Sequence, residues 1–192
     1  MSRRVWMALA VRGAVLQKPR GAFPHSTTGD APTYPWTVEV ANLRGPFSPE
    51  EVDAFLDDAV IPMRLATVGP TGWPLVVSLW FLRHGDEILA ATRPTSTLVA
   101  FLTQEPKCGF EIAGDEPPYR GVRGRAEVIV DDHAGGPVLE LLLTKYLGGT
   151  SSPLAQRLMA DAADEVCLRL RPRSVVSWDF TRRMSGGTAD PA

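Results

Sequence analysis

The sequence has few of the residues that mark metal centres, disulfide frameworks or membrane spans. Only two of its 192 residues are cysteines, Cys108 and Cys167, and they lie too far apart in the chain to match a metal-ligand spacing. Each falls in a predicted strand, where a free buried thiol is expected rather than a disulfide. No run approaches the roughly 20 apolar residues that a transmembrane helix needs. We therefore assign no metal site, expect no association with a membrane, and expect a reducing, cytoplasmic location.

An excess of charge of either sign is also missing. The chain has 20 lysines and arginines against 22 aspartates and glutamates, a formal net charge of −2. A nucleic-acid-binding protein needs a clustered cationic face to neutralise phosphates, so this balance argues against nucleic acid as a partner. Hydrophobic residues make up 44% of the chain and recur along most of it, which excludes extended disorder. The length predicts a single domain.

The N-terminal part of the chain lacks a clear structural pattern. Residues 2–6 resemble the start of a twin-arginine export signal, but Arg12 breaks the apolar run and no small-residue cleavage site follows cleanly. Residues 18–37 carry repeated prolines and glycines without a hydrophobic period. We therefore expect a disordered or loosely ordered leader, or an over-extended start, over residues 1–43. A folded domain over residues 44–184 and a flexible tail over residues 185–192 are expected to follow.

Capping residues predict where the helices begin. Ser48 is expected to be an N-cap, with Pro49 as the first helical residue and Glu51 as the capping-box partner, and the helix should end before Pro62. Its acidic first turn is interpreted as a helix-dipole arrangement rather than a catalytic pair. Caps and helical spacing predict three further helices, over residues 97–102, 138–147 and 152–163.

The remaining apolar runs have the pattern of strands. They lie over residues 63–68, 74–82, 88–92, 107–113, 121–130, 166–171 and 176–180. The run at 74–82 is nearly continuous, which predicts a strand buried on both faces. Six or more antiparallel strands with few helices predict a mainly β, α+β fold built as a small closed or partly closed barrel.

No catalytic motif can be recognised in the chain from spacing alone. There is no glycine-rich phosphate loop after a strand, no nucleophile elbow and no pair of histidines at metal-binding spacing. The histidines, His25, His84 and His133, lie far apart in predicted loops, where solvated turn residues are expected. We therefore assign no catalytic residue.

The order of six short segments nevertheless resembles one family. Residues 64–74 (RLATVGPTGWP) and 76–81 (VVSLWF) resemble the opening hairpin of the split-barrel flavin-binding family, also called pyridoxamine 5′-phosphate oxidase-like. Later segments continue the resemblance at residues 91–96 (ATRPTS), 118–126 (PYRGVRGRA), 145–148 (KYLG) and 177–180 (SWDF). The resemblance covers roughly residues 50–184.

The resemblance implies a fold and an activity. The fold is a six-stranded antiparallel split β-barrel with short flanking helices, and the protein is a homodimer with the cofactor at the subunit interface. The activity is that of an FMN-binding oxidoreductase, which transfers a hydride between the flavin and a small-molecule substrate. Two alternatives remain: a reductase that uses the deazaflavin coenzyme (factor 420), and a flavin- or haem-binding module without turnover.

The resemblance also implies where the cofactor lies. The ring is expected along two strands, at Arg64, Leu65, Ala66, Thr67, Val77, Ser78 and Leu79. The phosphate is expected at a strand-to-helix corner, at Thr92, Arg93, Thr95, Ser96 and Thr97. Exposed amides at a helix N-terminus suit an anion, although the same hydroxyls could equally be helix caps. The substrate side is expected at Tyr119, Arg120 and Trp178.

One departure from the family pattern concerns the phosphate. Thr97 and Leu98 stand where the family usually carries two adjacent cations, so FMN binding should be weakened unless another cation replaces them. Arg93 is the first replacement candidate, and Arg64 or Arg83 are others. The apolar residues Val76, Leu79, Trp80 and Phe81 are expected to be covered by the second subunit of the dimer.

Overall fold

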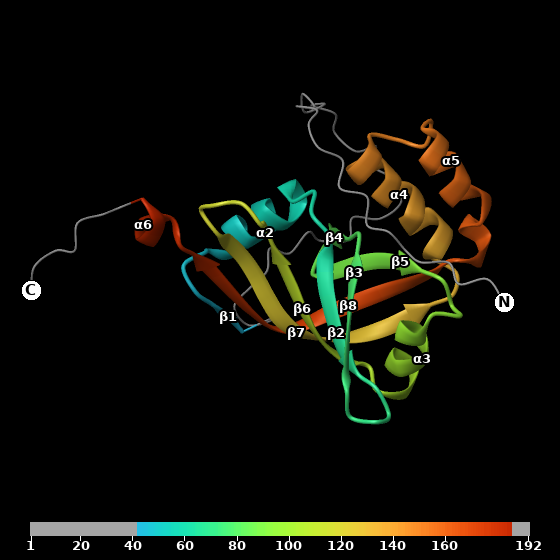
Figure 1. The fold of residues 1–192 in the computed structure, drawn as a ribbon, viewed down its shortest axis with the longest axis horizontal. Helices are drawn as coiled ribbons and strands as arrows, with labels where there is room; N and C mark the ends of the chain where they lie inside the picture. Colours follow the sequence, from blue (N-terminus) through green and yellow to red (C-terminus); the bar gives the residue numbers. More distant parts are fainter. Residues whose placement is uncertain (1–41, 186–192) are drawn as a thin grey trace, which may run out of the picture. The chain divides into compact units, whose positions relative to one another are not determined.

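The computed structural model describes residues 42–185, which form one eight-stranded sheet and several helices (Figure 1). The twin-arginine segment, His25, residues 1–41 of the expected leader and residues 186–192 of the expected tail lie outside the described residues. The strands are β1 Leu43–Arg44, β2 Met63–Val68, β3 Pro74–Leu79, β4 Leu82–His84, β5 Glu87–Thr92, β6 Lys107–Ala113, β7 Arg120–Asp131 and β8 Val166–Asp179. The helices are α2 Pro49–Asp58, α3 Thr97–Gln104, α4 Gly135–Leu147, α5 Pro153–Ala160, the 3₁₀ helix η1 Ala162–Asp164 and α6 Thr181–Met184.

The sheet is mainly antiparallel, as the strand pattern predicted. Its order is β3-β2-β6-β7-β8-β5-β4, and β1 joins it as a parallel partner of β8. The mainly β, α+β class is therefore confirmed, but the expected number of six strands is wrong. Two of the eight strands are only two and three residues long, too short to leave a periodic pattern in the sequence.

The apolar run at 74–82 does not form the single buried strand that we expected. It divides into β3 and β4, which lie at opposite ends of the strand order, with Trp80 and Phe81 between them. Residues of β3 alternate, so that Val77 packs against the core while Val76 is 62% exposed. Because an antiparallel sheet can leave one face uncovered, a continuous apolar run need not be buried on both sides.

The two alternating segments at the end of the chain form one long strand. β8 is 14 residues long and pairs with β7, with β5 and with β1. The register against β7 shifts by one residue between Arg125 and Ala126, which lie opposite Ser174 and Pro172. A bulge is a favourable place for Pro172, since proline has no N–H to give to the ladder.

The main core lies between the sheet and α2. Ser48 caps α2 as predicted: its hydroxyl accepts from the Glu51 N–H at 3.2 Å, and the Glu51 carboxylate accepts from the Ser48 N–H at 2.7 Å. Val52 and Leu56 of this helix are buried in the same cluster as Phe81. Burial of Phe81 and of its neighbours on β2 and β6 fixes the inner face of the sheet.

A second layer covers only one part of the other face. Val138 and Leu142 of α4 pack with Leu89 of β5 and Cys167 of β8, and α5 packs behind α4 (Figure 1). Both faces of β5 are therefore buried. Among residues 42–185, no helix combines the length and apolar character needed to cross a bilayer.

Candidate functional site

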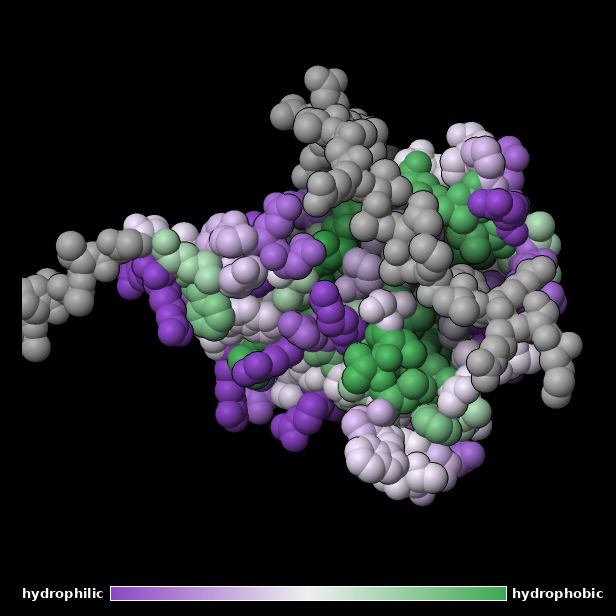
Figure 2. Space-filling view, in the orientation of Figure 1, coloured by the Kyte–Doolittle hydropathy of each residue, from purple (hydrophilic) through white to green (hydrophobic). Residues whose placement is uncertain are grey.

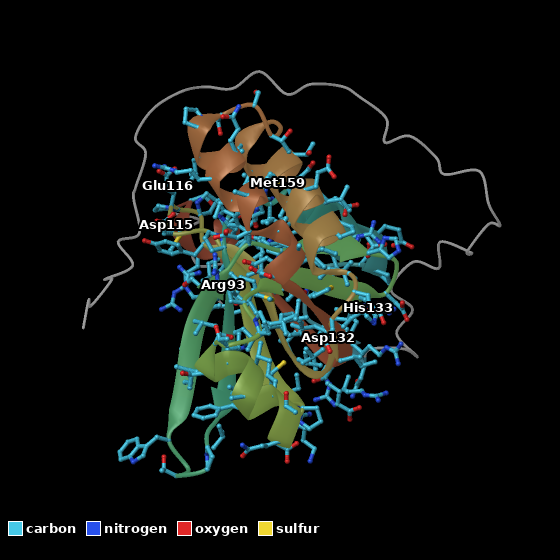
Figure 3. The ribbon with its side chains drawn as sticks, turned by 90° about the vertical axis from the view of Figure 1, so that its right-hand side faces the viewer. Arg93, Asp115, Glu116, Asp132, His133 and Met159 are labelled. Carbon is cyan, nitrogen blue, oxygen red and sulfur yellow. The ribbon has the colours of Figure 1, made fainter. Side chains whose placement is uncertain are left out.

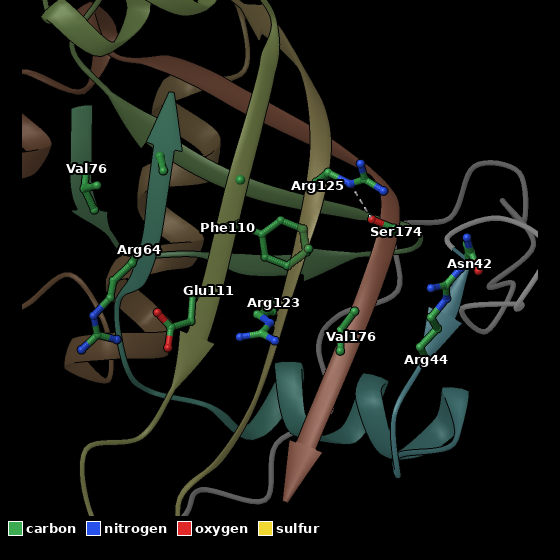
Figure 4. Close-up of a pocket in the computed structure, with 13 residues that line it drawn as sticks. Asn42, Arg44, Arg64, Val76, Phe110, Glu111, Arg123, Arg125, Ser174 and Val176 are labelled. Atoms are coloured by element: carbon green, nitrogen blue, oxygen red, sulfur yellow. Dashed lines mark hydrogen bonds between the residues drawn. The ribbon is translucent and has the colours of Figure 1, made fainter. Parts of the chain in front are cut away.

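The face of β2, β6, β7 and β8 turned away from the core carries a cavity of about 520 Å³ (Figure 4). Strand pairing builds it in rows. In one row Arg64, Glu111, Arg123 and Val176 lie side by side on four successive strands. In the next row Ala66, Gly109, Arg125 and Ser174 follow in the same order, with Val76 of β3 beyond Ala66. The small residues of the second row form the floor of the cavity.

One glycine beside this floor makes room for a core ring. A Cβ on Gly124 would lie 2.7 Å from the Phe110 ring and would also collide with the carbonyl oxygen of Ser174. Because Gly124 alternates with Arg123 and Arg125, this Cβ would lie on the core side of β7, where the Phe110 ring takes its space. Phe110 belongs to the core and also lines the cavity. The outer rim is more apolar toward β3, where Val68 and Val76 are exposed, and Figure 2 shows a hydrophobic patch over β2 and β3.

Positive charge dominates the cavity wall. Arg44, Arg64, Arg123 and Arg125 line it, against the single carboxylate Glu111. Within residues 42–185 none of these arginines forms an ion pair. Their contacts are weaker: Arg64 donates to the Ala113 carbonyl at 3.4 Å, Arg125 donates to the Ser174 hydroxyl at 3.3 Å, and the Arg123 guanidinium lies 5.6 Å from the centre of the Trp178 ring.

A second cavity of about 380 Å³ continues the first along β2 and β6. The two share Ala66, Gly109 and Arg125 as lining residues. Thr67 lines the second cavity and is only 2% exposed, and its hydroxyl oxygen has no hydrogen-bond partner among the described residues. A buried unpaired hydroxyl costs about 1–3 kcal/mol, and a ligand atom that reached Thr67 from the second cavity would offset that cost.

The residues predicted to lie beside the ring fall on both faces of the hairpin. Arg64, Ala66 and Thr67 line the cavities, and Ser78 lies opposite Arg64 in the pairing of β2 with β3. The other three predicted residues point inward: Leu65 is fully buried, and Val77 and Leu79 pack against the core. Alternation along β2 places Arg64 and Ala66 on the outer face and Leu65 and Thr67 on the inner one, so Thr67 borders the second cavity from the buried side of the strand.

The predicted phosphate corner lies elsewhere, between β5 and α3. Ser96 is an N-cap, its hydroxyl accepting from the Val99 N–H at 3.2 Å. Arg93 lies beneath the α4–α5 pair (Figure 3), in ion pairs with Asp161 and, at 3.8 Å, with Glu165. The hydrogen bond and charge of Asp161 raise the pKa of Arg93. None of the five predicted corner residues, Thr92, Arg93, Thr95, Ser96 and Thr97, lines either cavity.

The structure also shows where two other residues discussed for the phosphate, Leu98 and Arg83, lie. Leu98, which replaces a family cation, is 3% exposed and belongs to the core. Arg83, a candidate replacement cation, is held on α2 by Asp57 at 2.6 Å and Asp53 at 3.5 Å. Neither Arg83 nor Arg93 lines a cavity, whereas Arg64 does.

The predicted substrate-side residues lie at one end of the β7–β8 pair. Trp178 faces Gly121, where a Cβ would lie 2.8 Å from its ring, and it contacts the cavity through Arg123. Arg120 opens β7 opposite Asp179, and Tyr119 is 39% exposed just before it. Trp178 is therefore linked to the cavity wall by its ring contact with Arg123.

Sequence reasoning missed most of the cavity wall. Glu111, Arg123, Arg125 and Arg44 were not assigned, although 123 and 125 fall within a segment that carried the family resemblance. The available signal was the alternation of charge along β7, where Arg123, Arg125 and Glu127 are spaced by two. That alternation shows that the side chains share a face, but strand register decides what lies beside them.

Two titratable groups outside the cavity serve the packing of α4. Burial lowers the pKa of Lys145 from 10.5 to about 8, and its ammonium donates to the Leu56 carbonyl at 3.0 Å. Burial raises the pKa of Tyr146 to about 12; its hydroxyl donates to the Ile61 carbonyl at 2.8 Å and accepts from the Phe81 N–H at 3.2 Å. These bonds tie α4 to the end of α2 and to the turn between β3 and β4.

Two of the solved structures that match this chain show what it is similar to. The conserved hypothetical protein Rv2991 from Mycobacterium tuberculosis is 23% identical, with a TM-score of 0.62, over 77% of this chain and 93% of that one. An F420 reductase is 25% identical, with a TM-score of 0.57, over 67% of this chain and 98% of its own. Among curated proteins, none matches the sequence.

The family is settled by a longer match. The family model described as pyridoxamine 5′-phosphate oxidase matches residues 48–179, from the N-cap of α2 to the end of β8. This span is more than half of the chain and contains both cavities except for their β1 side. The resemblance carried by the six sequence segments is thereby confirmed, and the chain belongs to the pyridoxamine 5′-phosphate oxidase family.

Proposed function

We propose that this chain is an oxidoreductase that binds FMN along β2 and transfers a hydride between the flavin and a small-molecule substrate. The observation that carries the proposal is the pair of joined cavities over β2, lined by the predicted residues Arg64, Ala66 and Thr67. Family membership supports it, because the same strand is where the resemblance implies the ring.

The shape and polarity of the cavities fit a flat ring. Ala66 and Gly109 are neighbours in register and leave a floor without bulk, while Val76 and Val176 provide apolar walls. A volume of about 520 Å³ lies within the usual range for small-molecule sites. The unpaired hydroxyl of Thr67 would gain a partner from the polar edge of a heterocycle.

The predicted corner fits the phosphate less well than the strands fit the ring. Its cation Arg93 is neutralised by Asp161 and Glu165, and the hydroxyl of Ser96 is used as a cap. Thr95 and Thr97 remain exposed at the start of α3, so the corner offers hydroxyls and backbone amides without a free cation. We therefore expect Arg93→Ala to weaken FMN binding by less than about tenfold.

The chain's own residues would bind and orient the cofactor, which supplies the hydride-transfer chemistry when bound. Arg64 is held at the cavity rim by its bond to the Ala113 carbonyl, and its positive charge would favour negative charge developing on the ring. Val76 and Val176 would exclude water from the ring face. Trp178, with Tyr119 and Arg120 beyond it, would border the substrate.

A deazaflavin-dependent reductase is the second candidate. It is favoured by one observation, the 25% identity and TM-score of 0.57 to a structure described as an F420 reductase. The same cavities would hold the deazaflavin ring, since the Ala66–Gly109 floor does not discriminate between flat heterocycles of similar size.

We propose a homodimer with the cofactor at the interface. The apolar run that first suggested it is partly used within the subunit, because Phe81 is buried and Trp80 stacks on Tyr146 at 4.9 Å. The support that remains is the exposed apolar surface of Val68 and Val76 beside the cavities. Light scattering at micromolar protein should give the mass of a dimer; a monomer would contradict this part of the proposal.

The absorbance spectrum of the purified protein, followed by titration with FMN and with the deazaflavin coenzyme, tests the function. A flavin band or tight FMN binding supports the first candidate, and preferential deazaflavin binding supports the second. A Soret band would support a haem-binding module instead. Binding of neither coenzyme would overturn both oxidoreductase proposals.

A further inference from the structure

Within residues 42–185, four arginines gather at the first cavity without forming an ion pair. Arg83, Arg93, Arg169 and Arg173 each pair with an aspartate or glutamate at the surface of the sheet or its helices. In contrast, Arg44, Arg64, Arg123 and Arg125 surround one cavity without an ion pair among the described residues, and one glutamate accompanies them. An excess of positive charge at a concave surface attracts and concentrates anions.

We propose that this cavity is an anion-binding site, in which the carboxylate or phosphate group of a ligand lies between Arg123 and Arg125. The two arginines lie on the same face of β7 with one residue between them, so their Cα atoms are about 6.6–7 Å apart. That spacing allows both guanidinium groups to reach a single oxyanion. The proposal does not depend on whether a flavin binds.

Neighbouring residues complete the site on its β8 side. Ser174 lies opposite Arg125 and already accepts a hydrogen bond from it, so its hydroxyl proton is available for a ligand. Arg44 lies beside Val176, which in turn pairs with Arg123 (Figure 4). The ring of Trp178 lies 5.6 Å from the Arg123 guanidinium and restrains it. The arginines, the Ser174 hydroxyl and the ring that restrains Arg123 therefore lie at the same end of the cavity.

Glu111 makes the two ends of the cavity differ in charge. It lies between Arg64 and Arg123 in the row across β2, β6 and β7, so it lowers the positive potential at the β2 side of the cavity. An anionic group should therefore lie toward β7 and β8, and the uncharged part of the ligand toward the Ala66 and Gly109 floor.

Calorimetric titration of the full chain with citrate and with inorganic phosphate, at low ionic strength, tests the site. Arg123→Gln and Arg125→Gln should each weaken binding at least about tenfold, because each removes a charge-assisted hydrogen bond. Arg157→Gln is the matched control: Arg157 is an exposed arginine on α5 and lines neither cavity. Binding should be unchanged in this variant, and circular dichroism should show that all three variants are folded.

Three results would overturn the proposal. They are a wild type that binds neither anion at millimolar concentration, cavity variants that bind as the wild type does, and a control variant that loses as much affinity as the cavity variants. A second titration, of FMN and riboflavin into wild type and Arg123→Gln, identifies the source of the anion. If the preference for FMN disappears in the variant, the anion is the cofactor phosphate. If the preference persists while citrate binding is weakened, the anion belongs to a substrate.

Discussion

The two halves of the sheet differ in how many of their faces are covered by other parts of the described chain. On β5 and the start of β8 both faces are covered, the inner one by the core and the outer one by α4, where Leu89, Cys167 and Leu142 pack together. On β2, β6, β7 and the end of β8 only the inner face is covered within residues 42–185, and the outer face holds the two cavities. The same strand, β8, takes part in both halves.

The two halves also differ in whether their charged side chains form ion pairs. Glu87 on β5 is 6% exposed and is bound by Arg169 at 2.8 Å and Arg171 at 2.7 Å, so positive and negative groups balance at the covered end. At the cavity the arginines outnumber the carboxylates and form no ion pair with any residue of the described part of the chain. A stable layer satisfies its own polar groups, whereas a binding face leaves some of them for a ligand. The contrast therefore supports the proposal that the uncovered half is the binding face.

The largest expected effect is on stability, in the covered half. Leu142→Ala should lower the free energy of unfolding by about 2–5 kcal/mol, because Leu142 is 1% exposed between α4 and the sheet. Val76→Ala, in the uncovered half, should change it by less than about 0.5 kcal/mol, since this side chain is 62% exposed. Urea denaturation measures both, and equal losses would remove the distinction between the halves.

A smaller effect is expected when the balanced charges are broken. Burial raises the pKa of Glu87, but hydrogen bonds from Arg171 and Arg169 outweigh it, so the pKa lies below its ordinary value. The stabilisation is therefore present above the unfolded-state pKa and is lost as the pH falls through the folded-state pKa. Glu87→Gln should cost about 1–3 kcal/mol at neutral pH and flatten the acid dependence, whereas Glu111→Gln should do neither. Denaturation from pH 7 to pH 3 compares them.

Thr67 should show opposite effects on stability and binding. Thr67→Val removes the buried unpaired hydroxyl, so the free protein should become about 1 kcal/mol more stable while its affinity for the flavin or deazaflavin falls. Thr144→Val is the control, since that hydroxyl bonds within α4 to the Glu140 carbonyl and lies away from both cavities. Thermal unfolding and coenzyme titration give the two readings. Unchanged affinity would show that the hydroxyl has no ligand partner, and a loss of stability would show that it has a partner within the protein.

A further expected effect is a change of stability with alkaline pH. Burial lowers the pKa of Lys145 from 10.5 to about 8, so the unfolded chain binds more protons than the folded one between these values. Stability contributed by this group should therefore increase as the pH rises from about 8 to about 10.5. Lys145→Met should abolish this increase, which denaturation at pH 7.5 and pH 9.5 can measure. A variant with the same pH dependence as wild type would place the cause elsewhere.

Local patterns were the part of the fold that the sequence made predictable. The capping box at Ser48 and Glu51 and the alternation along residues 166–171 depend on neighbours in the chain, and both are observed. The division of the run at 74–82 was not predictable, because it depends on which strands the two halves pair with. β1 was missed because its two residues gain their conformation from β8.

The candidate site was predicted from family resemblance alone. Arg64, Ala66 and Thr67, predicted in this way, line the cavities, whereas Arg93, predicted for a phosphate, pairs with Asp161, which the sequence does not show beside it. The row that joins Arg64, Glu111 and Arg123 depends on the register of three strands, which no local pattern specifies.

The proposal that a coenzyme binds in the cavities is tested most directly by placing a large side chain on the cavity floor. FMN and the deazaflavin coenzyme should be titrated, by fluorescence, into wild type, into Ala66→Trp and into Ala100→Trp, an exposed position on α3 that lines neither cavity. We expect wild type and Ala100→Trp to bind one of the coenzymes equally well, and Ala66→Trp to bind it at least about tenfold more weakly. Equal affinity of Ala66→Trp and wild type, or no binding of either coenzyme, would contradict it.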